Sequence, residues 1–146
     1  MRDKMSRFVA LLAFGPAFAA NGATVDSYLC VVDAMTGFSF NDTTRLWEAA
    51  KFGAHSDLLV TRSRNKSVAW EVNEVGKSRP EAVCKKDFNK SDNLYCTGFA
   101  DFRFNRARLR FLYVHSNGYW NDDDTSGPFK EGMNTPVIGI GKCSPL

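Results

Sequence analysis

The sequence lacks three features that would point directly to a class of function. Its longest apolar run, residues 8–20, has thirteen mostly apolar residues, whereas a membrane-spanning helix needs about 20. No two of its four cysteines have the spacing of two to four residues that structural zinc sites use. Only two histidines, His55 and His115, can act as bases near neutral pH. These absences argue against a transmembrane helix, a zinc site and an acid–base hydrolase.

The N-terminal residues have the three parts of an export signal. A short basic opening precedes the apolar run, and "AFA" at Ala17 to Ala19 is the small-x-small pattern of a signal peptidase site. Gly15-Pro16 would interrupt the alternative, a buried N-terminal helix. We therefore expect residues 1–19 to be a cleaved signal peptide. Residues 20–146 are expected to form a single domain, periplasmic or secreted.

Loss of the signal changes the charge balance. The whole chain has a formal net charge of +3, whereas the part after residue 19 has 16 Lys and Arg against 15 Asp and Glu, a net charge of +1. The basicity therefore belongs largely to the signal, and it gives no support to a nucleic-acid partner or to stable membrane insertion.

All four cysteines lie in the exported part of the chain. An even number of cysteines in an exported chain predicts two disulfides. Four cysteines allow three pairings, and the sequence does not choose among them. We favour Cys84–Cys96, which closes a loop of hairpin size, and Cys30–Cys143, which ties the first strand to the last.

A period of two dominates the sequence after the signal and predicts β-strands. Three runs alternate clearly, "VAWEVNEV", "FADFRFN" and "RLRFLYVHS", and the residues expected to face inward are Val68, Trp70, Val72, Ala100, Phe102, Phe104, Leu109, Phe111 and Tyr113. Other strands are expected at residues 28–32, 37–40, 58–62, 94–97 and 137–143. The pattern predicts an all-β domain of about eight strands, a small antiparallel barrel or sandwich stapled by disulfides.

Three local patterns qualify this picture. Residues 43–52, "TTRLWEAAKF", could form a helical stripe, but no capping box precedes them, and we expect a strand or irregular structure. Asn117-Gly118 predicts a two-residue hairpin turn into "YWN". Gly139 and Gly141 in the last strand indicate either a tight bend or close approach of another backbone, or an edge strand at which glycine is simply tolerated.

Several stretches resemble, in their order along the chain, a family of small exported bacterial proteins. They are "YLCVVDAMTGFSF", "VAWEV", "VCKKDFN", "YCTGF", "FRFNRARLRFLY", "GYW" and "NTPVIGIGKCS", with four cysteines and a C-terminal TP-x-I-x-IGKCS pattern. The resemblance covers nearly the whole chain after the signal and implies a bacterial, disulfide-stapled, periplasmic or secreted β protein. It implies no catalytic or binding residues. The chain departs from the family at Arg106-Ala107-Arg108, where the family has a turn containing glycine.

Two charged runs invite readings that we do not favour. Arginines at 103, 106, 108 and 110 alternate with aromatic residues, as in binders of single-stranded nucleic acid, but a barrel with rings inside and arginines in water explains the same pattern. The run Asp122, Asp123 and Asp124 matches the start of a calcium loop, yet the twelfth position is Met133 rather than glutamate. We expect no metal and no cofactor.

The segment from Asn121 to Asn134 is long for a loop in a compact domain, and long ordered loops are disproportionately functional. Aromatic rings beside carboxylates are common where a sugar or a protein binds. The candidate partner-binding residues are Tyr119, Trp120, Asp122, Asp123, Asp124 and Phe129.

The function that we expect is that of an exported, non-enzymatic, monomeric β-domain that binds a protein or glycan partner in the cell envelope or outside the cell. One alternative is a lipocalin-like carrier of a small apolar ligand, motivated by the 12 phenylalanines. A hydrolase using His55 is the weakest alternative, because adjacent Ser, His and Asp in a sequence do not make a triad.

Overall fold

The computed structural model describes residues 25–53, 57–117, 119–120, 131–132 and 134–146. These residues form nine strands: β1 (Ser27–Asn41), β2 (Leu46–Phe52), β3 (Leu58–Arg62), β4 (Trp70–Glu74), β5 (Pro80–Cys84), β6 (Asn93–Gly98), β7 (Asp101–Asn105), β8 (Arg110–His115) and β9 (Val137–Pro145). None of the described residues forms a helix that is long and apolar enough to cross a membrane. The expected signal peptide lies outside the described residues.

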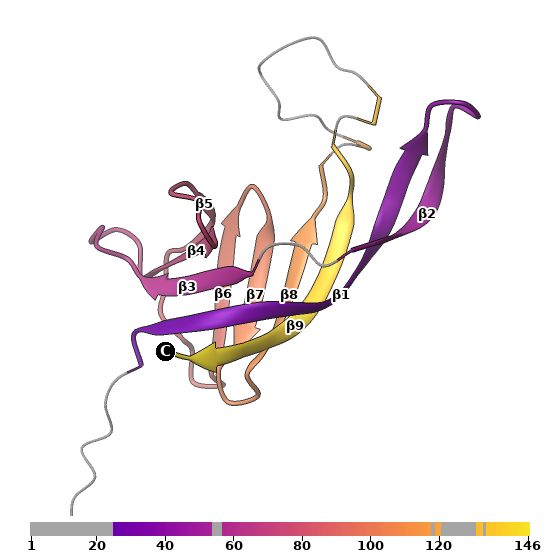
Figure 1. The fold of residues 1–146 in the computed structure, drawn as a ribbon. Coiled ribbons are helices and arrows are strands. Elements are labelled where there is room, and N and C mark those ends of the chain that lie inside the picture. The colour runs from indigo at the N-terminus through magenta and orange to yellow at the C-terminus, as the bar shows by residue number, and fades with distance from the viewer. Residues whose placement is uncertain (1–24, 54–56, 118, 121–130, 133) are drawn as a thin grey trace, which may run out of the picture.

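The nine strands form one antiparallel sheet in the order β2-β1-β3-β4-β5-β6-β7-β8-β9, and β9 also pairs with β1. The strands β1 and β3 to β9 therefore close into an eight-stranded barrel, while β2 lies outside this ring (Figure 1). The all-β prediction is confirmed, and of the two architectures expected, the barrel is the one adopted.

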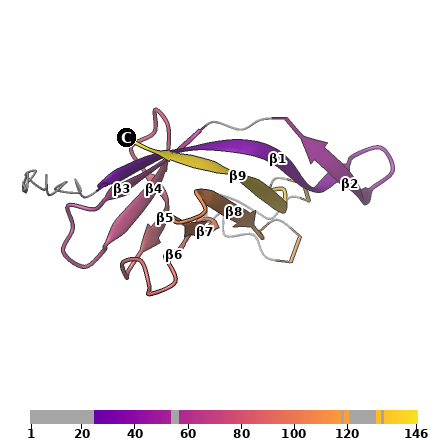
Figure 2. The same ribbon diagram turned by 90° about the horizontal axis from the view of Figure 1, so that it is seen from below.

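The length of β1 lets it take part in three pairings. Its residues 27–30 pair with β3, residues 28–37 with β9, and residues 35–41 with β2. The β1–β9 register shifts between Val32 and Ala34, which marks a bulge, and bulges bend a strand. The second half of β1 therefore leaves the barrel together with β2 as a projecting hairpin (Figures 1 and 2).

The segment 43–52 is a turn followed by a strand, as expected. The side-chain oxygen of Asn41 accepts hydrogen bonds from the backbone N–H groups of Thr43 and Thr44, at 3.0 and 3.2 Å. Such an Asx arrangement stabilises a turn and competes with helix formation. The chain then pairs with β1 from Leu46 to Phe52.

The inward face follows the predicted alternation closely. Trp70, Val72, Phe102 and Phe104 are each at most 1% exposed. At one end of the barrel the rings of Tyr28, Trp70, Phe88 and Phe104 contact one another, with centroids 4.9 to 6.3 Å apart. This end of the barrel is therefore filled by its own side chains.

Both predicted disulfides are present, Cys30–Cys143 and Cys84–Cys96, and all four cysteines are buried. Cys30 and Cys143 lie directly opposite each other where β1 and β9 close the barrel. The C-terminal strand is thereby fixed covalently to the first strand.

Two local predictions are wrong. Leu109 does not face inward, because it lies in the β7–β8 turn with a positive φ of 53° and is 37% exposed. Tyr119 and Trp120 do not form a strand with β8, which pairs instead with β7 and β9. The backbone hydrogen-bonding groups along one edge of β8 pair with β9, which the disulfide anchors. That edge is therefore not available to the hairpin partner that the sequence predicted.

Candidate functional site

An apolar surface lies on the outside of the barrel, where four strands run side by side. Directly opposed residues of antiparallel strands share one face of a sheet. Leu112 of β8 is opposite Ile140 of β9, which is opposite Ala34 of β1. Further along are the opposed pairs Val114–Ile138 and Phe38–Ala49. We call this surface the outer apolar face, and it comprises Ala34, Phe38, Ala49, Leu112, Val114, Ile138 and Ile140.

The outer apolar face is accessible to solvent at its centre. Phe38 is 54% exposed, Ile140 53% and Ile138 42%. A shallow hollow of about 330 Å³ lies between β9, β1 and β2, with Ile138, Ile140 and Lys51 among its lining residues. Isolated exposed apolar residues are ordinary, but contiguous ones mark interaction sites.

An aromatic cluster continues this surface onto the projecting hairpin. Phe40 and Trp47 are opposed residues whose rings lie 5.5 Å apart, and the ring of Tyr119 meets Trp47 edge-on at 5.7 Å. The indole N–H of Trp47 donates a hydrogen bond to the Glu131 carboxylate at 2.5 Å. Arg45 stacks on Phe40, with its guanidinium carbon 4.9 Å from the ring centroid.

The structure brings only part of the predicted binding segment to this surface. Tyr119 joins the aromatic cluster and is 65% exposed, and Trp120 is 72% exposed. The remaining candidates, Asp122, Asp123, Asp124 and Phe129, lie outside the described residues. Sequence reasoning missed Phe38, Phe40 and Trp47, although the spacing of two phenylalanines before a polar turn and a tryptophan after it was a usable signal.

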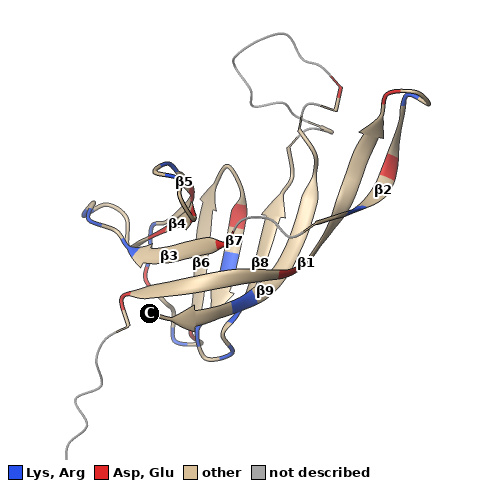
Figure 3. Ribbon diagram, viewed as in Figure 1, with Lys and Arg blue, Asp and Glu red and all other residues tan. Residues whose placement is uncertain are grey.

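Positive charge borders the outer apolar face. Lys51 lines its hollow, and Arg110 and Lys142 are opposed residues at the end of the same face. Lys142 forms a long ion pair with Asp33, 3.7 Å between Nζ and Oδ2. Figure 3 shows a basic segment of β9 beside an acidic segment of β1.

The arginine-rich run is a solvated face, as the sequence favoured. Phe102, Phe104 and Phe111 are buried inside the barrel and cannot stack on bases. Arg106 is already engaged, with an ion pair to Asp92 at 2.7 Å and its guanidinium over the Phe88 ring.

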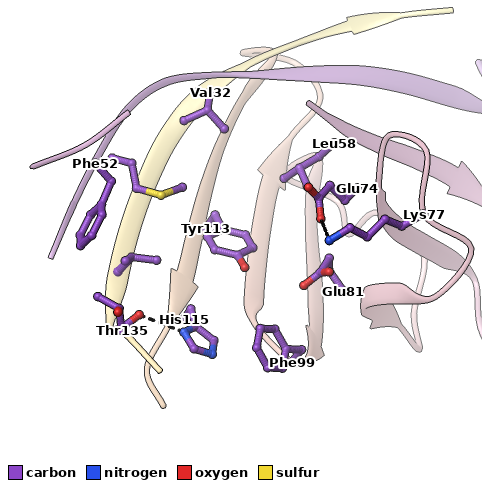
Figure 4. Close-up of a pocket in the computed structure, with 12 residues that line it drawn as sticks. Val32, Phe52, Leu58, Glu74, Lys77, Glu81, Phe99, Tyr113, His115 and Thr135 are labelled. Atoms are coloured by element: carbon purple, nitrogen blue, oxygen red, sulfur yellow. Dashed lines mark hydrogen bonds and ion pairs between the residues drawn. The ribbon is translucent and has the colours of Figure 1, made fainter. Parts of the chain in front are cut away.

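A cavity of about 400 Å³ lies at the end of the barrel opposite the packed rings of Tyr28, Trp70, Phe88 and Phe104 (Figure 4). Its apolar wall comes from Val32, Met35, Phe52, Leu58 and Val137. Its polar wall comes from Glu74, Lys77, Glu81, Tyr113, His115 and Thr135. At the level of the cavity the inward position of β9 opposite Tyr113 is Gly139, which has no side chain, whereas large rings fill the other end of the barrel.

Several polar groups of the cavity have defined partners. Lys77 Nζ lies 2.6 Å from the Glu74 carboxylate, and this hydrogen bond raises the pKa of Lys77. Burial, reinforced by the negative charges of Glu81 and Glu74, raises the pKa of Tyr113 to about 12. The Tyr113 phenol therefore stays protonated across the physiological range.

His115 is buried, because it is the last inward residue of β8. Its Nδ1 lies 3.1 Å from the carbonyl oxygen of Thr135, which can only accept, so Nδ1 carries the hydrogen. With the hydrogen on Nδ1 alone, Nε2 is an acceptor, and it is buried without a hydrogen-bond partner among the described residues. The other histidine, His55, lies outside the described residues.

Among the described residues, no three His, Cys, Asp or Glu side chains are grouped so that they could hold a metal ion. Comparisons with protein-family models, with curated proteins and with solved structures give no match for this chain.

Proposed function

We propose that this protein is an exported, non-enzymatic binding domain that uses the outer apolar face and its aromatic cluster to bind a partner protein. The observation that carries the proposal is the exposure of Phe38, Ile138 and Ile140 on one continuous four-stranded surface. A barrel needs apolar residues inside, but nothing in its closure requires isoleucine and phenylalanine outside.

The compartment is supported by the disulfides. Two buried disulfides and no free cysteine in an all-β domain are compatible with an extracellular or periplasmic location, since such bonds persist in oxidising compartments. The export signal expected at residues 1–19 fits the same location.

The charges around the face favour an acidic partner rather than a second copy. Lys51, Arg103, Arg110 and Lys142 border the apolar residues, against Asp33 and Asp101, so the margin is net positive. A second copy would bring a margin of the same sign against this one, whereas a partner with carboxylates around an apolar centre would be complementary. Branched aliphatic side chains at the centre favour protein over glycan, because interface cores are apolar.

The proposal is tested by panning a displayed peptide library against the purified protein. Enriched peptides should carry aliphatic or aromatic residues flanked by Asp or Glu. Ile140→Asp should weaken their binding by about 2 kcal/mol, or roughly thirtyfold, as for a central interface residue. Tyr95→Ser is the matched control, because Tyr95 is 57% exposed but lies on β6, away from the face.

Equal binding by Ile140→Asp and the unaltered protein would contradict the proposal, as would enrichment of basic peptides. Concentration-dependent dimerisation that Ile140→Asp abolishes would show instead that the face joins two copies of the chain.

A further inference from the structure

The cavity at the open end of the barrel is a separate feature from the outer apolar face. It lies inside the barrel, on the opposite side of the sheet from Ile138 and Ile140. Its volume of about 400 Å³ falls at the small end of the range for ligand pockets, roughly 300 to 1,000 Å³. The inference below does not depend on the partner proposed above.

The lining of the cavity has an apolar part and a polar part, as expected of a site for an amphipathic molecule. Val32, Met35 and Leu58 are buried and supply an apolar wall from β1 and β3. The polar residues come from different elements: Glu74 ends β4, Glu81 lies in β5, and His115 ends β8. In Figure 4 the acidic residues Glu74 and Glu81 lie on the right with Lys77; His115 and Thr135 lie at the lower left, and Val32 and Phe52 lie toward the upper left.

The polar side is rich in hydrogen-bond acceptors. It holds the two carboxylates of Glu74 and Glu81 and the unpaired acceptor Nε2 of His115. Lys77, which is paired with Glu74, is the one Lys or Arg among the described lining residues. Within the described residues Glu81 makes no ion pair, so one carboxylate at the cavity has its charge uncompensated by a direct contact.

Buried polar atoms without partners are rare in folded proteins, and each such atom calls for an explanation. A ligand that donates hydrogen to Nε2 would supply the missing bond. A carboxylate ligand could not donate, and it would meet the like charges of Glu74 and Glu81. An ammonium group has three donors and no acceptor, which complements this set of acceptors.

Aromatic rings add to the preference for a cation. Phe99 stacks on the His115 ring, with the centroids 4.4 Å apart, and Phe52 lines the apolar side. Cations are attracted to the faces of aromatic rings.

We propose that the cavity binds a small amphipathic amine, with the alkyl or aryl body against Val32, Met35 and Leu58 and the ammonium group between Glu81 and His115. The recognition is by an apolar volume and a cluster of acceptors, so the ligand class is a primary amine with a short apolar chain or ring.

The test is calorimetric titration of the full-length, disulfide-bonded protein with three probes of equal chain length: n-octylamine, n-octanol and octanoate. Octylamine should bind about tenfold or more tightly than octanol, since hydrogen bonds to charged groups exceed neutral ones. Octanoate should bind most weakly of the three.

Variants assign the effect to the cavity. Glu81→Gln should weaken octylamine about tenfold and leave octanol unchanged, because it removes a charge and keeps the shape. Asp101→Asn, on the outer surface of β7, is the matched control and should leave all three affinities unchanged. His115→Phe should also weaken octylamine while preserving the stacking on Phe99. Val137→Phe should block all three probes by filling the cavity.

Three results would overturn the proposal. They are octanoate binding as tightly as octylamine, octylamine affinity that neither Glu81→Gln nor His115→Phe lowers, and the absence of heat with every probe. Melting curves for each variant would distinguish a lost site from a lost fold.

Discussion

Cys30 and Cys143 are directly opposed residues of β1 and β9, and their disulfide covalently closes the barrel at the same strand pair that closes it by hydrogen bonds. The bond spans 113 positions of the chain, against 12 for Cys84–Cys96. In the chain-entropy model a longer closed loop restricts the unfolded state more.

Removing the closing disulfide should therefore cost more stability than removing the other one. We expect the double variant Cys30→Ala, Cys143→Ala to lose about 4 to 5 kcal/mol of unfolding free energy, and Cys84→Ala, Cys96→Ala about 3 kcal/mol. Guanidinium unfolding followed by tryptophan fluorescence measures both. The reverse order of the two losses would show that native packing at Cys84 and Cys96, rather than loop length, dominates.

The disulfide also orients β9. Cys143 faces inward to meet Cys30, and because side chains alternate along a strand, Gly141 and Gly139 face inward too. Ile138 and Ile140 are thereby turned to solvent. Phe111 of β8 occupies the space that a side chain at Gly141 would need.

Gly141 and Gly139 should consequently differ in their tolerance of a methyl group. At Gly141 a Cβ would overlap the carbonyl oxygen of Val31 and lie 2.5 Å from Phe111 Cε1, so Gly141→Ala should cost about 1 to 3 kcal/mol. At Gly139 the nearest atom is the flexible end of Met35, at 3.2 Å, so Gly139→Ala should cost clearly less. Thermal unfolding of the two single variants gives the comparison, and equal losses would contradict it.

The alternation of apolar residues was sufficient to predict the strands whose inner residues are large. Phe102, Phe104 and Trp70 identify their own inward faces. The same rule cannot orient β9, where glycines face inward and isoleucines outward, against the usual pattern. The outer apolar face was therefore not predictable from periodicity, and it depends on a covalent constraint between strands at opposite ends of the chain.

The cavity was beyond sequence reasoning for a related reason. Its lining residues come from seven strands and from the segments beside them, so they converge only when the barrel closes. His115 stood next to an Asn-Gly dipeptide that favoured an exposed turn, whereas the pairing of β8 with β9 extends to His115 and buries its ring.

Asp87 should give the protein a component of stability that is lost in acid. Partial burial acts to raise the pKa of this carboxyl, but hydrogen bonds from the Trp70 indole, Arg62 and the Phe88 backbone, with the charge of Arg62, outweigh it and lower the pKa. A carboxyl with a lowered folded-state pKa stabilises the fold above its unfolded-state pKa, about 3.9, and loses that contribution as the pH falls through the folded value.

In Asp87→Asn the unfolding free energy should therefore fall less steeply with pH below about pH 4. Its effect at neutral pH should be about 1 kcal/mol or less, because the side chain is 48% exposed and its ion pair with Arg62 is screened by solvent. Urea unfolding across the acid range measures the curve, with Asp101→Asn as the control for loss of one negative charge. An acid limb as steep in Asp87→Asn as in the unaltered protein would contradict the assignment.

Tyr113 should produce the corresponding effect in alkali. Burial first, and then the charges of Glu81 and Glu74, raise its pKa from 10.0 to about 12, so the folded state holds this proton more tightly than the unfolded state. Its stabilising contribution is complete below the unfolded-state pKa and is lost as the pH rises through the folded-state pKa. Near-ultraviolet titration should show a late tyrosinate step that is missing in Tyr113→Phe. Burial also raises the pKa of Tyr28, and the step of Tyr28 should be retained in that variant. If the late step survives in Tyr113→Phe, the Tyr113 phenol is not enclosed by the cavity wall. The charges of Glu81 and Glu74, which are proposed to attract an amine, then do not raise the pKa of Tyr113 either.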